Sequence, residues 1–480
     1  MRKLQNSNIN YFNFKIFSDG YLLSNDTGSF LFLREDEFTK FIQNNYVNDM
    51  ELSRKLIDNH FVIDTHKELF VDEVSGRVRR IKSYLFESTQ LHIFILTGNC
   101  NQGCIYCQAS ARKGHIDPDK NMNFVTAEKS VDIALSSPSK NLTFEFQGGE
   151  PLLNFDVLKH IVEYTKKQNA SKSKNVIFNL VTNLIALDND KLEYLLLNRV
   201  TICTSIDGPK FIHKKNRPCD IPSFFDKIKN NIIKINELVS AKGINNKVQA
   251  IQTTTRHSLN YPKEIIDEYI SIGFHNIFLR PLTPLGFANE SWESIGYSPE
   301  MFVKFYKEAL NYIIDLSCRG VSISENYATI LLKKIITKSP INYMELRSPC
   351  GGSIGQLAYN YDGFIYTCDE GRMVAETGDH SFRLGNVLNS SYNELVCNPV
   401  TKSICISSCL EIIPGCEECV YSPYCGTCPI YSYVHGGSIF SIMPGNYKCR
   451  INKGILDVLF EKIIENDTNV MNVFENWVNK

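Results

Sequence analysis

Three cysteines lie close together directly after an apolar, strand-like run. Cys100, Cys104 and Cys107 have the spacing C-x3-C-x2-C and follow the run at 91–97. Three thiolates on one tight loop can bind three irons of a cubane cluster and leave the fourth iron without a protein ligand. The alternatives are a zinc knuckle or three buried thiols, but zinc usually takes four ligands in paired C-x2-C units. The loop therefore predicts an iron–sulfur site with one open iron, where a small molecule can bind.

A glycine-rich turn follows the next predicted strand. Residues 142–147 lead into the sequence Gly148, Gly149, Glu150, Pro151. Paired glycines let the backbone approach a ligand closely and expose its carbonyl groups. The cysteine loop, Tyr106 before its third cysteine and this turn together resemble the radical S-adenosylmethionine (SAM) enzymes. The resemblance implies a [4Fe–4S] cluster whose open iron binds SAM, with Tyr106 and the turn at the cofactor and the turn holding the SAM amino group.

Two later strand ends offer further candidate cofactor contacts. The predicted strand at 176–182 ends beside Asn183, and the strand at 200–207 contains Ser205 and precedes Arg217. Because arginine suits planar carboxylates, Ser205 and Arg217 are candidate anchors for the SAM carboxylate, and Asn183 is a further contact that the resemblance implies. For each residue the alternative is a strand-end turn or a surface charge.

The composition excludes several other classes of protein. The 480 residues are 43% hydrophobic and carry a net charge of −1, so there is no basic field for nucleic acid and no polybasic tract for a membrane surface. No apolar run reaches about 18 residues, and the first six residues lack the apolar run of a signal peptide. We therefore expect a cytoplasmic protein in which clustered cysteines bind metal instead of forming disulfides. Of the 16 cysteines, three lie at 100–107 and eleven between Cys318 and Cys449, whereas Cys203 and Cys219 stand alone as core or incidental thiols.

Residues 86–300 alternate strand-like and helical segments, as in parallel α/β folds. The predicted strands are 91–97, 142–147, 176–182, 200–207, 248–254 and 276–281, and the helices between them include 127–135, 156–167 and 262–272. In parallel barrels the chemistry lies at the C-terminal ends of the strands, which is where these motifs fall. Six such units resemble the partial (β/α)6, TIM-like barrel of the radical SAM enzymes.

Residues 1–85 predict a small α+β domain with three short strands, at 11–17, 20–25 and 28–33, and two helices, at 35–42 and 49–57. This order resembles the peptide-recognition module of many peptide-modifying enzymes, which presents a strand edge to a substrate peptide. The alternative is a plain cap over the barrel. Because residues 1–85 contain no cysteine, the sequence predicts that no cluster depends on them directly.

Residues 301–345 predict helices, at 302–316 and 327–336, that bridge to a cysteine-rich region at 346–480. There Cys350 comes first, followed by Gly-x4-Cys at 363–368 and C-x2-C-x5-C at 416–425. Cys428 comes next, and Cys449 is the distant last cysteine. The pattern resembles the SPASM extension, which binds two auxiliary [4Fe–4S] clusters in enzymes that modify peptides and proteins. One spacing departs from the extension, since C-x2-C stands where C-x3-C is usual. The implied ligands are Cys416, Cys419, Cys425 and Cys449 for one cluster, and Cys350, Cys368 and Cys428 for the other.

The second of these ligand sets has three cysteines, so its fourth ligand is open. Cys405 and Cys409 form a C-x3-C pair that could supply it, or they are spare thiols and one iron stays free. The alternative for the whole region is a double zinc ribbon, because zinc and iron–sulfur sites share cysteine spacings.

Three runs narrow the resemblance within the superfamily. They lie at 145–155, at 278–288, and at 359–363 together with 369–373. With the cluster motifs they resemble the B-type radical SAM maturases of the His-Xaa-Ser system (HxsB) along nearly the whole chain. The resemblance implies a peptide or protein substrate with His-Xaa-Ser repeats, a partner maturase, and an electron donor such as a flavodoxin or ferredoxin.

The implied reaction begins with one-electron cleavage of SAM to a 5′-deoxyadenosyl radical, which abstracts hydrogen from a substrate side chain. Asp369 directly follows Cys368, where related sulfatase maturases have a proton-accepting aspartate; the alternative is a hydrogen-bonded structural carboxylate. Two other enzymatic hypotheses remain: the protein is a thioether-forming peptide cross-linker or an anaerobic sulfatase maturase. A non-enzymatic iron–sulfur carrier or sensor is the third alternative, and it leaves the Gly-Gly-Glu-Pro turn unexplained.

Overall fold

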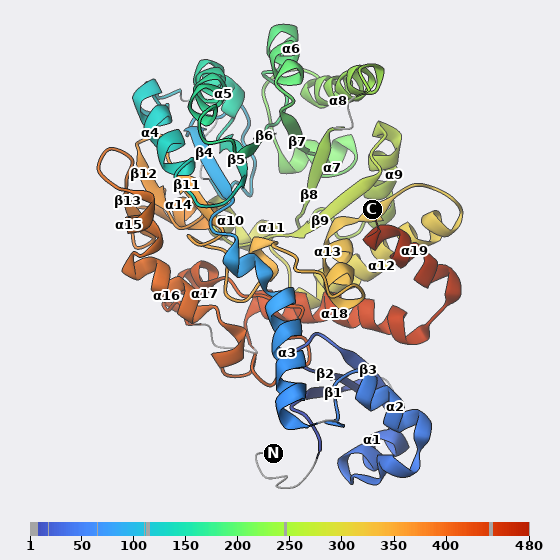
Figure 1. Ribbon diagram of the computed structural model, residues 1–480. Coiled ribbons are helices and arrows are strands. Elements are labelled where there is room, and N and C mark those ends of the chain that lie inside the picture. Colours follow the sequence, from blue (N-terminus) through green and yellow to red (C-terminus); the bar gives the residue numbers. More distant parts are fainter. Residues whose placement is uncertain are drawn as a thin grey trace.

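The computed structural model describes residues 8–17, 19–64, 66–109, 111, 116–243, 247–440 and 445–479. Within these residues the main sheet has ten strands, in the order β10-β9-β8-β7-β6-β5-β4-β11-β12-β13. The strands β4 to β9 are parallel neighbours in chain order and form the expected partial barrel (Figure 1). Their bounds are β4 (Leu91–Thr97), β5 (Asn141–Gly148), β6 (Asn175–Val181), β7 (Thr201–Ser205), β8 (Gln249–Thr254) and β9 (Asn276–Pro281).

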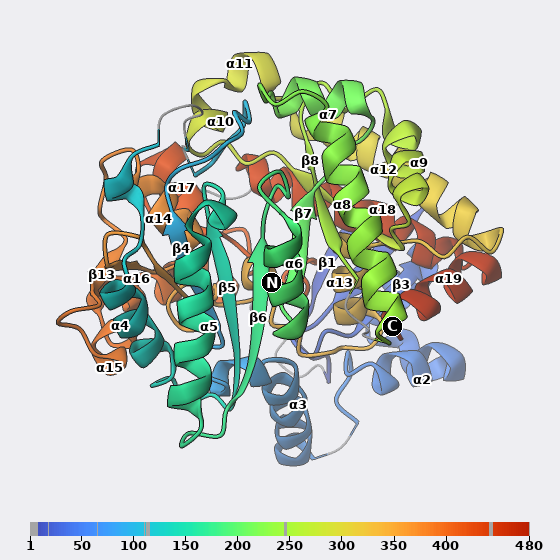
Figure 2. The same ribbon diagram turned by 90° about the horizontal axis from the view of Figure 1, so that it is seen from above.

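Amphipathic helices connect these strands and cover the outer face of the sheet (Figure 2). In α5 (Phe155–Asn169) the buried residues Val157, Leu158, Ile161 and Val162 recur at helical spacing and form one apolar stripe. The other helices on the barrel are α4 (Phe124–Ala134), α6 (Asn189–Leu197), α7 (Lys210–Asn216), α8 (Phe224–Ala241) and α9 (Pro262–Ile272).

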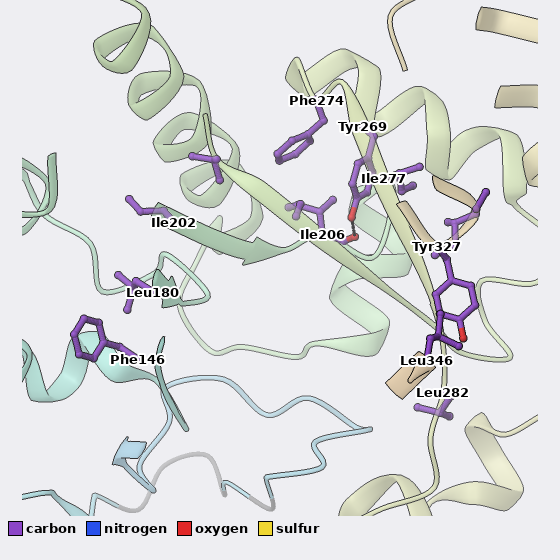
Figure 3. Close-up of a cluster of buried hydrophobic side chains, with 14 of the residues drawn as sticks. Phe146, Leu180, Ile202, Ile206, Tyr269, Phe274, Ile277, Leu282, Tyr327 and Leu346 are labelled. Atoms are coloured by element: carbon purple, nitrogen blue, oxygen red, sulfur yellow. Dashed lines mark hydrogen bonds between the residues drawn. The ribbon is translucent and has the colours of Figure 1, made fainter. Parts of the chain in front are cut away.

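The barrel core is dominated by branched aliphatic and aromatic side chains from the strands and from these helices. Figure 3 shows Phe146, Leu180 and Ile202 on adjacent strands and Tyr269 of α9 reaching across to the end of β7. The buried Tyr269 hydroxyl donates a hydrogen bond of 2.8 Å to the carbonyl of Ile206. This contact satisfies a polar group in the core and fixes the strand end that carries part of the site.

The sheet continues past residue 300 at both edges. β10 (Ser324–Glu325) pairs in parallel with β9, and β11 (Gln356–Tyr359) pairs in parallel with β4. The strands β12 (Phe364–Tyr366) and β13 (Arg383–Asn386) then extend the sheet in antiparallel order. The predicted divisions at 300 and 345 therefore do not coincide with breaks in the sheet, because segments from both later regions pair with barrel strands.

The N-terminal region has its own antiparallel sheet, formed in the described residues by β1 (Asn13–Phe17), β2 (Gly20–Ser24) and β3 (Phe30–Arg34). The helices α1 (Glu35–Ile42), α2 (Met50–Asp58) and α3 (Lys67–Ile81) follow it. A separate hydrophobic cluster, including Leu23, Phe41 and Phe61, holds this unit together. Figure 1 places it below the barrel, next to a long C-terminal helix.

The remaining helices lie in the C-terminal half. They are α10 (Phe287–Glu290), α11 (Trp292–Ile295), α12 (Pro299–Cys318), α13 (Asn326–Ile335), α14 (Asp369–Ala375), α15 (Tyr392–Val396), α16 (Pro399–Ser407), α17 (Pro429–Gly436), α18 (Tyr447–Glu465) and α19 (Thr468–Val478). The main hydrophobic core includes Phe305, Leu459 and Trp477 beside the barrel residues. The barrel and the C-terminal helices therefore share one core.

The fold class predicted from the sequence is confirmed, and the six barrel strands lie where they were expected, to within two residues. The first six residues, which carried the expectation about a signal peptide, are outside the described part of the chain. Among the described helices, none has both the length and the apolar character that a bilayer crossing requires.

Candidate functional site

The C-terminal ends of the barrel strands surround a cavity of about 240 Å³. Its walls come from the loops after β4, β5, β6 and β7 and from the ends of β8 and β9, with one further contribution from α14. The sequence-predicted residues that line it are Cys100, Cys104, Tyr106, Cys107, Gly148, Gly149, Asn183, Ser205 and Arg217. Residues predicted separately from several strand ends therefore meet at one place.

The cysteine loop is held from two sides. The Asn183 amide lies 4.0 Å from the Cys100 thiol and donates a hydrogen bond of 2.7 Å to the side-chain oxygen of Asn101. On the other side the Arg217 guanidinium lies 3.8 Å from the Cys104 thiol. Burial raises the pKa of Cys104 to about 12. In the metal-free protein the thiol therefore stays protonated, and binding of iron has to displace its proton.

A buried carboxylate organises the floor of the site. Asp207, fully buried just after β7, accepts hydrogen bonds from the Tyr106 hydroxyl at 2.8 Å and the Arg217 Nε at 3.1 Å. Asn216 donates to the same carboxylate at 3.2 Å, and the guanidinium lies 5.1 Å from the centre of the Tyr106 ring. Asp207 thus fixes the aromatic residue inside the cysteine loop and the cation next to it.

Gly148 and Gly149 allow two backbone segments to pack closely against each other. A Cβ on Gly148 would come within 2.2 Å of the Thr97 carbonyl oxygen, and one on Gly149 within 2.1 Å of the Asn99 carbonyl oxygen. The Gly149 amide donates to Thr97 at 2.7 Å. Because Thr97 and Asn99 lead into the cysteine loop, the glycine turn sets the position of that loop.

Glu150 and Pro151 are buried behind the cavity and are not among its described lining residues. The Glu150 carboxylate accepts from the Thr182 hydroxyl at 2.7 Å and from the backbone N–H of Asn183 at 2.8 Å, and burial raises its pKa. It joins the end of β5 to the end of β6. The assignment of these two residues to the cofactor therefore stays a prediction that the side-chain contacts do not support.

Two arginines that were not predicted as site residues also line the cavity. Arg280 at the end of β9 pairs with Glu345 at 2.7 Å, and Lys448 lies 3.3 Å from the same carboxylate. Burial disfavours the charge on Glu345, but Lys448 and Arg280 outweigh it and hold its pKa at about 2. Arg372 of α14 donates to Asp369 at 2.6 Å.

A model of the radical SAM superfamily matches residues 94–245, which contain the cysteine loop and the ends of β4 to β7 at the cavity. The chain is a radical SAM enzyme. The cysteine-type anaerobic sulfatase-maturating enzyme of Clostridium novyi (strain NT) is 28% identical over 339 residues, covering 68% of this chain and 84% of that relative.

Solved structures agree on the fold of this radical SAM enzyme. anSMEcpe with bound AdoMet and the Kp18Cys peptide superposes with a TM-score of 0.65, at 21% identity, over 81% of this chain and 99% of that one. Streptococcus suis SuiB bound to the precursor peptide SuiA gives a TM-score of 0.53, at 14% identity, over 91% and 99%. The [4Fe–4S] cluster and SAM expected from the sequence are the cofactors of this superfamily, and the three free thiols on one cavity wall fit them.

The C-terminal cysteines of the radical SAM enzyme form two groups. Burial and the neighbouring thiols of Cys425, Cys449 and Cys419 raise the pKa of Cys416 to about 12. Burial likewise raises the pKa of Cys368, with Cys350 and Cys428 among the groups that add to the shift. Their members belong to the two ligand sets that the resemblance implies, and the assignment of each set to one cluster stays a prediction. No three His, Cys, Asp or Glu side chains in the described residues are arranged for a single metal ion, whereas the thiolates of a cubane bind separate irons.

The second group has an additional charged neighbour. Besides burial, Glu370 raises the pKa values of Cys350, Cys368 and Cys428. Cys405 interacts instead with Cys409, whose thiol contacts the Cys405 carbonyl at 3.2 Å. The fourth ligand of that set stays open, and the sequence reasoning, with its attention on cysteines, did not consider the carboxylate of Glu370.

The missed residues share a feature that is visible in the sequence. Asp207 and Arg280 are charged residues at or just after the C-terminal ends of otherwise apolar barrel strands. A charge at such a place has to be paired or functional, because burying it alone is costly. Glu345, Arg372 and Lys448 carry no comparable pattern, since segments distant in sequence bring them to the cavity.

Proposed function

We propose that this radical SAM enzyme modifies a peptide or protein substrate with His-Xaa-Ser repeats after translation. The observation that supports this proposal is the meeting of the three subfamily runs at one cavity. The run at 145–155 contributes Gln147 and the two glycines, the run at 278–288 contributes Arg280, and the run at 369–373 contributes Arg372 and Met373. Residues that narrow the resemblance within the superfamily thus line the space where a substrate meets the cofactor.

The cofactors supply one-electron cleavage of SAM and abstraction of hydrogen from the substrate, and the chain's own residues position the reactants. Cys100, Cys104 and Cys107 hold the first cluster. Asp207 orients Tyr106 and Arg217 below it. Arg217 has one guanidinium edge on Asp207, and its other edge lies beside the Cys104 thiol, where a SAM carboxylate can bind.

The substrate side of the cavity is lined by ion pairs. Arg280 pairs with Glu345 and Arg372 pairs with Asp369, so a partly buried carboxylate balances the charge of each cation. Such pairs present donors to backbone carbonyls of a bound peptide without a large net charge. Asp369 is held by Arg372, which is the geometry of a structural carboxylate, and its catalytic role stays a proposal.

The C-terminal region, at 346–480, is proposed to bind two auxiliary [4Fe–4S] clusters that accept the electron of the oxidised substrate. Cys416, Cys419, Cys425 and Cys449 supply four free thiols, which is enough to close every iron of one cluster. The N-terminal unit is proposed to bind the substrate peptide at the edge of β3, which pairs only with β2 among the described strands.

The proposed partners are a second maturase and an electron donor such as a flavodoxin or ferredoxin, in the cytoplasm. The donor is needed because each cleavage of SAM consumes an electron.

The test is anaerobic incubation of the reconstituted enzyme with SAM, a reductant and a His-Xaa-Ser repeat peptide, followed by mass spectrometry. We expect 5′-deoxyadenosine and a peptide altered in mass, with fragment ions that place the change within a repeat. The chain with all three cysteines of the first loop changed to alanine is the control and should give neither product. Deoxyadenosine without peptide modification, over repeat peptides from several sources, would contradict the His-Xaa-Ser assignment.

A second candidate is sulfatase maturation, favoured by the similarity to the Clostridium novyi enzyme over 68% of this chain. A cysteine-containing sulfatase peptide in the same assay separates the two hypotheses. The sulfatase-maturase hypothesis predicts that formylglycine forms, whereas the His-Xaa-Ser hypothesis predicts no reaction with this peptide. A thioether cross-linker is tested by a cysteine-containing precursor peptide, whose product resists thiol alkylation.

A further inference from the structure

The N-terminal sheet contacts the loop that carries two of the C-terminal cysteines. The Tyr11 hydroxyl donates to the carbonyl of Glu417 at 2.9 Å. The Asn13 amide donates to the same carbonyl at 3.1 Å and to the carbonyl of Cys419 at 3.2 Å. The Ser24 hydroxyl donates to the carbonyl of Val420 at 2.6 Å. These side chains, at or beside β1 and β2, thus bind three backbone carbonyls within residues 417–420 of one loop.

Asn13 and Ser24 are the buried donors of this set, whereas Tyr11 is 54% exposed. Asn13 is 9% exposed and Ser24 is 1% exposed, so water cannot easily replace either donor. A buried carbonyl that loses its donor is left unsatisfied, and the segment that carries it shifts to find another. In the reverse direction the buried Tyr424 hydroxyl donates to the Gly28 carbonyl at 3.1 Å. The sheet and the loop are therefore tied from both sides.

The same sheet also holds the helix that bears the last cysteine of this group. Lys15 of β1 pairs with Asp457 of α18 at 2.5 Å, and Phe30 of β3 meets Phe460 of α18 edge-on, with 5.3 Å between ring centres. Cys449 lies in the first turn of α18. Both segments that supply the thiols of Cys416, Cys419 and Cys449 therefore rest on the N-terminal sheet.

We propose that Asn13 and Ser24 are positioning residues for the cluster held by Cys416, Cys419, Cys425 and Cys449. The inference rests on the proposed function, which places a cluster there. The Cys419 carbonyl is itself an acceptor of Asn13, so this bond fixes the backbone from which a ligand side chain projects. Residues 1–85 supply no thiol, yet the retention and the redox properties of the cluster depend on them.

This arrangement links two proposed activities of the N-terminal unit. β1 and β2 carry the side chains that bind the cysteine loop, while β3 lies at the opposite edge of the same sheet. A peptide added at β3 would join the sheet whose other strands hold the loop. Binding of substrate and the state of the cluster are then coupled, and each affects the other by the same factor.

The test compares Asn13→Ala, Ser24→Ala and Ser24→Thr with Asn10→Ala in the full-length, reconstituted protein. Asn10 is the matched control, because its amide donates to the His60 carbonyl at 2.9 Å inside the N-terminal unit and does not contact the cysteine loop. Release of iron to a chelator is followed under anaerobic conditions, together with the EPR spectrum and the midpoint potential of the reduced clusters. The first-loop cysteines are replaced by alanine in a parallel set, so that the signals arise from the C-terminal clusters.

We expect Asn13→Ala and Ser24→Ala to release one cluster's iron at least about fivefold faster than the parent and to shift its EPR signal. Ser24→Thr, which keeps the hydroxyl, and Asn10→Ala should behave like the parent. Parent-like release and spectra in both alanine variants would overturn the inference, as would an equal effect of Asn10→Ala, which would trace the loss to unfolding of the N-terminal unit. A parent without C-terminal iron would overturn the proposed cluster and this inference together.

Discussion

Replacing Asp207 by asparagine tests how the floor of the site is held. The carboxylate is fully buried, and it accepts from Tyr106, Asn216 and Arg217. Asparagine has nearly the same shape, but it loses the negative charge and turns one acceptor into a donor. The Arg217 guanidinium would then remain buried without its counter-ion, and one of the donors would face another donor.

The magnitude follows from the burial of this pair. Removing one partner of a buried ion pair typically costs about 3–5 kcal/mol, because an uncompensated charge is left behind. This lowers the folding equilibrium constant between roughly 150-fold and 5,000-fold. The matched control is Asp226→Asn, since Asp226 pairs with Lys210 at 2.7 Å but both side chains are about half exposed. Such a surface pair contributes at most about 1 kcal/mol.

The assay is denaturant unfolding of the metal-free protein followed by tryptophan fluorescence, with iron retained by the first loop as a second readout. A double-mutant cycle with Arg217→Met completes it, since removal of both charges should restore about 2–3 kcal/mol relative to the sum of the single changes. Additive single changes, or an Asp207→Asn cost no larger than that of Asp226→Asn, would refute the reasoning. Iron loss in Asp207→Asn without loss of stability would assign Asp207 to the cofactor alone.

Three further outcomes are expected. Replacing the three cysteines of the first loop by alanine should abolish SAM cleavage and remove about four irons per chain, leaving the C-terminal iron that elemental analysis detects; deoxyadenosine formation in this variant would contradict the assignment. Gly149→Ala should lose first-loop iron, because its Cβ would lie 2.1 Å from the Asn99 carbonyl oxygen, whereas Gly76→Ala in α3, where a Cβ meets open space, should stabilise the protein by about 0.5–1 kcal/mol in thermal unfolding. Burial lowers the pKa of His92 to about 3, below its usual 6.5, so its contribution to stability is present above pH 6.5 and is lost as the pH falls toward 3. Between pH 7 and 5 the free energy of unfolding of the parent should therefore fall by about 2 kcal/mol more than that of His92→Gln. An equal dependence on pH in the two proteins would show that His92 does not titrate in this way.

The sequence predicted the barrel well, because alternating apolar strands and amphipathic helices report their own burial. β4 and β9 lie within the expected bounds, and the helix at Glu35–Ile42 is placed to the residue. Helices α3, α8 and α18 were not predicted, although each is 15 residues or longer. These helices mix charged and apolar residues and are flanked by polar loops. Their boundaries depend on tertiary packing, which the sequence pattern does not show.

Some residues of the candidate site could likewise be predicted from the sequence, and others could not. The first-loop cysteines and the glycine turn were predictable, because local spacing determines their chemistry. Glu345, Lys448 and the donors of the N-terminal sheet were not, because they reach their positions through contacts between distant segments. Lys448 and Glu345 are 103 residues apart, and Asn13 and Glu417 are 404 residues apart. The role of Glu150 at the joint between β5 and β6 likewise needs the neighbouring strand to be known.

The pairing of β4 has a consequence for how the chain is made. β4 lies between β5, which follows soon after it, and β11, which is synthesised much later. On the ribosome the strand that leads into the cysteine loop therefore has one unpaired edge while most of the protein is still being translated. An exposed edge can pair with other chains, and distant parallel pairing is slow. A nascent chain that stalls before residue 356 is consequently expected to need a chaperone to avoid aggregation.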